Sequence, residues 1–257
     1  MIFRRNTIFM ILKNTVTHFG KFILWQRQII SRPENWRMYY QETIRQMTDI
    51  GIGSLSVVFM ISVFLGAVTS VQFFYQMDGT LVPPYYIGYI VRDMTIIELA
   101  PTFTCLVLSG KVGSNLAAEI GGMRQKEHID AMEIMGVNTS AYLVMPKIIA
   151  ALIMIPILVC VSTMVSIMGA YLASVPTGLF SGADFVKGLR SFFIPHHVTM
   201  LFVKAITFSY ILTAVSCYQG YFVKGGSIEL GQASTRAVVN SYILILIADY
   251  IIAVVLT

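Results

Sequence analysis

The most informative shortage in this sequence is a shortage of charge. Asp, Glu, Lys and Arg make up 12% of its 257 residues, whereas 56% are hydrophobic. About a quarter of the residues in soluble domains are charged, so most of this chain is not expected to face water. A bilayer suits such a composition, and a helix needs about 20 apolar residues to cross it. The length allows about five such helices plus loops and leaves no room for a separate soluble domain.

Cysteine and histidine are also scarce, which argues against disulfides and metal sites. Cys105, Cys160 and Cys217 all lie in apolar stretches without metal-ligand spacing, so we interpret them as small buried hydrophobes. The pair His196-His197 has no third ligand nearby and fits a loop surface better than a metal site. We therefore expect no metal and no cofactor.

Signatures of enzymes are missing as well. Gly110-Lys111 looks like the end of a phosphate-binding loop, but Cys105 replaces the required glycine and Val112 replaces the Ser or Thr. The chain is therefore not expected to bind ATP in this way. No clustered nucleophile or acid–base set stands out, so no catalytic residue is expected. A cleavable signal peptide is not expected either, because the first apolar run, 8–12, is short and is followed by Lys13.

Long apolar runs predict an all-α membrane protein with five transmembrane helices. Residues 50–77 and 148–183 contain no formal charge, and the second run is long enough that its helix should end near Ser174, before Pro176. The expected spans are 50–77, 94–116, 148–174, 198–222 and 237–256. Residues 1–49 then form an N-terminal segment, and residues 50–257 hold the spans.

The N-terminal segment predicts helices that lie at the membrane surface. Apolar residues fall on one stripe of a helix over 8–30, which is typical of an interfacial amphipathic helix; a helix packed on a protein partner is the alternative. A second, polar helix is expected over 35–49, where aromatic residues suit the interface. The stripe consists of Ile8, Leu12, Val16, Phe19, Ile23 and Ile30, and the aromatic residues are Trp36, Tyr39 and Tyr40.

Basic residues are distributed unevenly, and this predicts the orientation. A basic block that leads into a span indicates anionic lipid rather than nucleic acid. Cytoplasmic loops carry an excess of Lys and Arg, so we expect a cytoplasmic N-terminus and a cytoplasmic loop over 118–147. That side then carries Arg4, Arg5, Lys13, Lys21, Arg27, Arg32, Arg37, Arg45, Arg124, Lys126, Lys147, Lys224 and Arg236, against Arg92, Lys187 and Arg190 on the other.

Two acidic residues lie inside expected spans, where a charge is costly unless it is paired or hydrated. Glu98 is a candidate for function, but Thr95 to Glu98 also fits a capping box that would start a helix. Asp249 is the second candidate, and it could instead pair with Lys204. Both alternatives remain open from the sequence.

The loop over 118–147 contains the most distinctive pattern. Apolar residues alternate with acidic ones and Gly136 follows, which predicts a short amphipathic helix parallel to the membrane. Such a helix could dock into a groove of a soluble partner, or it could cover its own bundle. The apolar residues are Ile129, Met132, Ile134 and Met135, and the acidic ones are Glu127, Asp130 and Glu133.

Several of these motifs resemble the MlaE (YrbE) family, the permeases of bacterial phospholipid ATP-binding cassette (ABC) transporters. The chain departs from the family pattern at Ile97 and Lys111, where an arginine is usual, and at Ala100, where a glycine is usual. The motifs that carry the resemblance are Glu98-Leu99-Ala100-Pro101, Gly113-Ser114, Ala118 to Arg124, Glu127 to Met132, Met135 to Asn138, and Gly231 to Val239.

The resemblance implies a multi-pass protein of the bacterial inner membrane and assigns roles to residues. It implies a homodimer around a lipid cavity, an MlaF-like ATPase subunit, an MlaD-like periplasmic MCE protein, and phospholipid transport that maintains outer-membrane asymmetry. A lipid-modifying membrane enzyme or a scaffold is the alternative. The implied lipid-cavity residues are Glu98, Leu99, Val68, Val71, Gln72 and Tyr75. The implied residues for coupling to the ATPase are Glu119, Arg124, Glu127, Asp130, Met132, Glu133, Met135 and Gly136.

Overall fold

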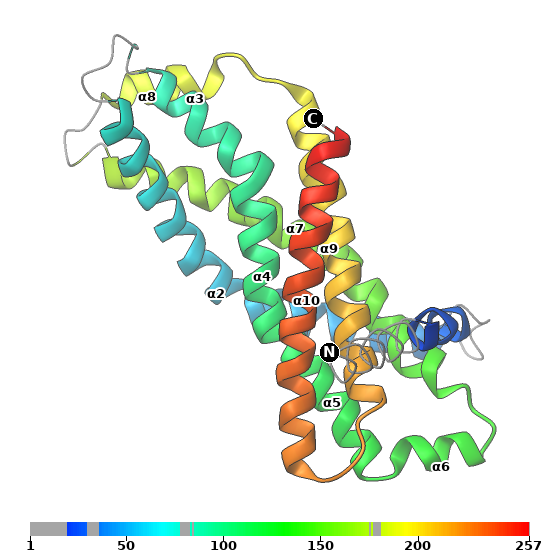
Figure 1. Ribbon diagram of the computed structural model, residues 1–257. Helices are drawn as coiled ribbons and strands as arrows, with labels where there is room; N and C mark the ends of the chain where they lie inside the picture. The colour runs from blue at the N-terminus through cyan, green and yellow to red at the C-terminus, as the bar shows by residue number, and fades with distance from the viewer. Residues whose placement is uncertain are drawn as a thin grey trace, which may run out of the picture.

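The computed structural model is all-helical over the residues it describes, which are 20–29, 36–77, 83, 85–174, 176 and 181–256 (Figure 1). Five of its helices are long and apolar enough to cross a membrane. The expected fold class, with a short N-terminal helix before five spans, is therefore confirmed.

The first long helix, α2 (Trp36–Met77), has 42 residues. The separate polar helix expected over 35–49 is instead the first part of α2. Residues 36–49 contain neither Pro nor Gly, so no residue in this stretch ends the helix before the apolar span begins.

The second long helix is continuous from Tyr85 to Gln125 but changes its winding twice. It comprises α3 (Tyr85–Met94), the π-helix η1 (Thr95–Phe103), α4 (Thr104–Leu108), the π-helix η2 (Ser109–Gly113) and α5 (Ser114–Gln125). The expected start at 94 and the capping role of Glu98 are wrong, because Thr95 lies inside the helix. Pro101 lacks an N–H, and the wider turns of η1 accommodate it.

The third span, α7 (Thr139–Ser174), packs tightly alongside α2. It starts before the expected residue 148 and ends at the expected Ser174. A Cβ added to Gly66 would lie 1.8 Å from the carbonyl oxygen of Ser166, so the two backbones can approach only because this residue is glycine. Hydroxyl pairs join the helices at Ser62–Ser162 and Ser70–Ser174, each at 2.7 Å.

In the described part of the chain, α7 is followed by α8 (Gly182–Arg190), α9 (Pro195–Tyr221) and α10 (Ser227–Leu256). The last span was expected from 237, but α10 begins at Ser227. The turn before α10 is short because Gly225 adopts a φ of +115° and the Glu229 carboxylate accepts the Gly226 N–H at 2.9 Å.

The two ends of the bundle carry different short helices (Figure 1). The α8 end holds α8 against α3, and the buried Arg92 guanidinium donates there to the carbonyls of Leu189, Ser191 and Phe192. The α6 end holds the turn after α5 and the short helix α6 (His128–Ile134).

The helical residues 20–29 pack on the chain itself at the end of α9. Trp25 is 3% exposed and its ring meets that of Tyr218 at 5.5 Å. Ile23, a member of the expected apolar stripe, is 53% exposed, so the stripe does not face the protein here. The rest of the stripe, residues 8–19 and 30, lies outside the described residues.

Candidate functional site

Three charged side chains from three helices meet inside the bundle. The Lys204 ammonium of α9 lies 2.5 Å from Glu98 Oε2 of η1 and 2.6 Å from Asp249 Oδ1 of α10. The Thr102 hydroxyl donates to the other Asp249 oxygen at 3.3 Å. We call Glu98, Lys204 and Asp249 the charged triad. The alternative of an Asp249–Lys204 pair is therefore confirmed.

The charged triad is buried unequally. The Lys204 side chain is 0% exposed and that of Asp249 is 11% exposed, whereas that of Glu98 is 42% exposed. Two carboxylates against one ammonium leave a formal excess of one negative charge. Because Glu98 is the most exposed member, it is the one that a ligand or water can reach from outside the bundle. Burial of Lys204 is tolerable because it is paired on both sides.

The α2 residues assigned to the lipid cavity form one surface stripe. Val68 is 55% and Tyr75 is 67% exposed, Gln72 is also exposed, and Val71 is half-buried. Their spacing of three and four residues places them on one helix face. Half-buried Leu99 is placed differently, since it lines a small cavity of about 10 Å³ with Ile61 and Leu65 of α2. The charged triad joins Glu98 to α9 and α10 instead.

The loop assigned to coupling is held by its own charges. Arg124 Nη1 lies 2.8 Å from Asp130 and 3.5 Å from Glu133, and its guanidinium lies 5.9 Å above the Tyr221 ring. The Tyr221 hydroxyl donates to Glu133 at 2.9 Å. Asp130 and Glu133 thus hold α6 against α5 and α9.

Exposed apolar residues gather at the end of α6. Ile129 is fully buried and Met132 packs against the core, whereas Ile134 is 87% and Met135 is 71% exposed. Gly136 then reverses the chain with a φ of +81°. We call Ile134 and Met135 the α6 knob. Of the two methionines assigned to coupling, only Met135 belongs to it.

The remaining coupling residues lie beside α6. The Lys147 ammonium, 2% exposed, donates to Glu119 at 2.7 Å and links α7 to α5. Glu127 is exposed and adopts a φ of 59° just before α6. The Glu119–Lys147 pair thus joins α5, which precedes α6, to α7, which follows it. Glu127 provides the turn from which α6 starts.

Sequence reasoning missed some partners that the structure reveals. Tyr221 and Thr139 bind Glu133, and no charge or spacing pattern marked them. Among the described residues, no group of three His, Cys, Asp or Glu side chains could hold a metal ion.

Comparison with known proteins gives a family and several relatives. The family "Permease MlaE" matches residues 43–255. A probable ABC transporter permease protein of Rickettsia bellii is 36% identical over 91% of this chain and 90% of its own length. A probable ABC transporter permease protein of Synechocystis is 30% identical over 84% of this chain and 82% of its own.

A plant protein is also similar. TRIGALACTOSYLDIACYLGLYCEROL 1, a chloroplastic protein of Arabidopsis thaliana, is 27% identical over 88% of this chain and 64% of its own length.

Proposed function

Because this chain belongs to the MlaE family of ABC transporter permeases, we propose that it moves phospholipids between the bacterial inner membrane and a periplasmic carrier. It is a multi-pass, non-catalytic membrane component, and ATP hydrolysis takes place on an ATPase subunit. The observation that carries the lipid assignment is the half-exposed Glu98 inside the second span, since an ionisable group within a membrane span marks a ligand path.

The exposed stripe on α2 supports a lipid substrate. Val68 and Tyr75 present apolar and aromatic surface for acyl chains, while Glu98 and Gln72 offer polar contacts for a headgroup. The name of the Arabidopsis relative also contains that of a lipid, trigalactosyldiacylglycerol. In this account the cavity forms between two copies of the chain, and the largely exposed α10 provides surface for the contact.

The α6 end is the docking site for the ATPase in this account. The α6 knob offers exposed apolar side chains on a helix that ion pairs hold in place. Arg124, Lys126 and Lys224 lie in or next to the turns at the α6 end of the bundle, so by the positive-inside rule we infer that this end faces the cytoplasm. An MlaD-like MCE protein would then meet the α8 end in the periplasm.

Glu98→Gln should lower the amount of bound phospholipid without unfolding the chain. Lys204 keeps its ion pair with Asp249, so the fold survives, but the carboxylate that a headgroup amine can reach is lost. A charge-assisted hydrogen bond is worth about 1.5–3 kcal/mol, which predicts roughly ten- to a hundredfold lower occupancy. Mass spectrometry of lipids that co-purify with the protein measures this.

The matched control is Glu229→Gln, because Glu229 lies at the start of α10 and caps a turn far along the helix from Asp249. It should leave the lipid content unchanged. Full lipid content in Glu98→Gln would remove Glu98 from the substrate path.

A further inference from the structure

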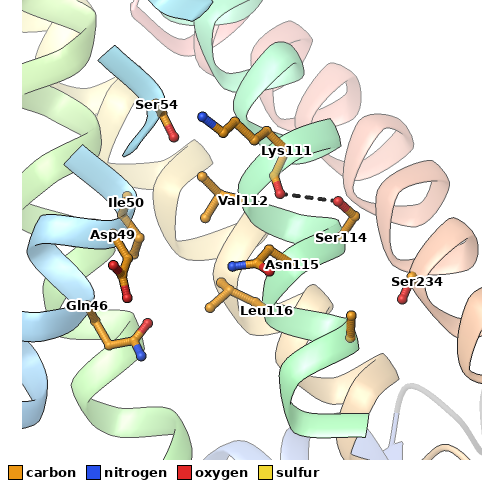
Figure 2. A pocket seen from close by; sticks show the side chains of 11 residues that line it. Gln46, Asp49, Ile50, Ser54, Lys111, Val112, Ser114, Asn115, Leu116 and Ser234 are labelled. Atoms are coloured by element: carbon orange, nitrogen blue, oxygen red, sulfur yellow. Dashed lines mark hydrogen bonds between the residues drawn. The ribbon is translucent and has the colours of Figure 1, made fainter. Parts of the chain in front are cut away.

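A cavity with both polar and apolar lining residues lies beside η2 and α5, on the part of the second long helix that leads to α6 (Figure 2). Its volume is about 600 Å³, and its walls come from α2, from η2 and α5, and from α10. Lys111 and Glu98 lie on the same continuous helix, 13 residues apart, so the cavity and the charged triad occupy different parts of it. The lining residues are Gln46, Asp49, Ile50, Ser54, Lys111, Val112, Ser114, Asn115, Leu116, Ala118 and Ser234.

One buried side chain in the cavity wall lacks a partner. Ser54 is 0% exposed, and its hydroxyl has no hydrogen-bond partner within the described part of the chain. Figure 2 shows it on the wall near Lys111. A side chain without exposed surface cannot contact a ligand in the cavity, so the polar groups open to a ligand are those of the exposed residues Asp49, Lys111 and Asn115.

Charges of both signs face the same cavity at different depths. Lys111 donates to the carbonyl of Gly53, and an ammonium has three donors, so it can bind an anion as well. Asp49 is the last charged residue before the uncharged stretch 50–77, and it is exposed. Four residues separate Asp49 from Gly53 on α2, which is about 6 Å along the axis. The cation therefore lies deeper in the apolar layer than the anion.

A cation near the apolar layer and an anion further out match a phospholipid with an amine in its headgroup. In a leaflet the phosphate lies next to the acyl region and the amine lies further out. We propose that this cavity is a second lipid site, in which Lys111 binds the phosphate and Asp49 binds the amine of a headgroup such as phosphoethanolamine.

The proposal goes beyond the proposed function and rests on it only for the class of ligand. The site associated with Glu98 lies on an earlier part of the second long helix, whereas this cavity lies on the part that leads to α6. A lipid held here would occupy the membrane layer opposite the periplasmic carrier, at the point where lipid enters or leaves the permease on that side.

Photolabelling tests the site on the full chain in nanodiscs. The probes are phosphatidylethanolamine and phosphatidylglycerol, each with a photoreactive group next to the glycerol. Phosphatidylethanolamine should label peptides within 46–54 or 111–118. Lys111→Gln should reduce this labelling at least fivefold, and Lys111→Arg should retain it because the positive charge remains. Asp49→Asn should remove the preference for phosphatidylethanolamine over phosphatidylglycerol.

Controls separate the possible ligands and the two sites. Lys224→Gln, which removes an exposed loop lysine, should leave labelling unchanged. Tighter binding of soluble glycerophosphoethanolamine than of phosphatidylethanolamine would overturn the lipid assignment in favour of a soluble phosphate ester. Equal labelling in Lys111→Gln and the parent chain would overturn the site. Loss of labelling in Glu98→Gln but not in Lys111→Gln would also overturn it, while still supporting the proposed function. Labelling that depends on Lys111 in a chain without lipid transport would support the site and contradict that function.

Discussion

Lys204→Met should leave a permease that is hard to recover in folded form. The substitution removes the ammonium that pairs with both Glu98 and Asp249 and leaves the largely buried Asp249 carboxylate without its cation. Breaking a buried ion pair from one side costs about 3–5 kcal/mol. For a chain of this size that corresponds to a melting midpoint lower by roughly 6–20 °C. Size-exclusion chromatography after heating in detergent measures the shift.

A second substitution should restore most of the lost stability. In Lys204→Met/Asp249→Asn, the uncompensated buried charge is gone, and the remaining Glu98 is exposed enough to stay hydrated. Lys224→Met, at an exposed loop position, is the matched control and should not change the melting midpoint. A Lys204→Met variant as stable as the parent chain would show that the charged triad does not hold α9, α10 and η1 together.

Ile134→Asp/Met135→Asp should abolish binding of the ATPase subunit while the bundle stays folded. Both side chains of the α6 knob are largely exposed in the single chain, so aspartate is tolerated there without a partner. In a docked complex they would occupy an apolar groove. Loss of such an anchor costs at least about 2 kcal/mol, or roughly thirtyfold in affinity. Co-purification with the ATPase and titration in detergent measure the effect.

The matched control for the α6 knob is Ile228→Asp. Ile228 is 74% exposed at the start of α10, which lies at the same end of the bundle as α6 (Figure 1). The Ile228→Asp variant should still bind the ATPase. The orientation is tested with the same reagents, since added ATPase should bind inside-out membrane vesicles and not spheroplasts. Unchanged binding in the double variant would mean that α6 only covers its own bundle.

The sequence predicts the number of spans because the apolar runs are long enough to cross a bilayer. It does not predict where the helices begin, because polar residues also form helix when no Pro or Gly interrupts them. The start of α2 at Trp36 is an example, and α10 begins at Ser227 even though Gly231 lies in its polar first part. The capping pattern at Thr95 to Glu98 was misleading for the same reason, since a short motif cannot show that the helix has already begun at Tyr85.

The candidate site could be predicted only in part. Glu98 and Asp249 stand out because charges are rare in apolar runs, but their common partner Lys204 depends on the packing of η1, α9 and α10. In the same way, alternation of apolar and acidic residues predicts α6 but not the directions of its side chains. Asp130 and Glu133 turn toward Arg124, and Met132 turns toward the core. Which residues remain for a partner therefore depends on the tertiary structure.

The central claim, that this chain is the lipid path of an ATP-driven transporter, is tested most directly by reconstitution. The permease and its ATPase subunit are placed in liposomes with fluorescent phospholipid, and transfer to or from an MCE-domain acceptor is followed with and without ATP. The account predicts transfer that requires ATP and falls at least tenfold in Glu98→Gln, while Glu229→Gln remains active. Transfer that proceeds equally without ATP, or that is unaffected by Glu98→Gln, would contradict it.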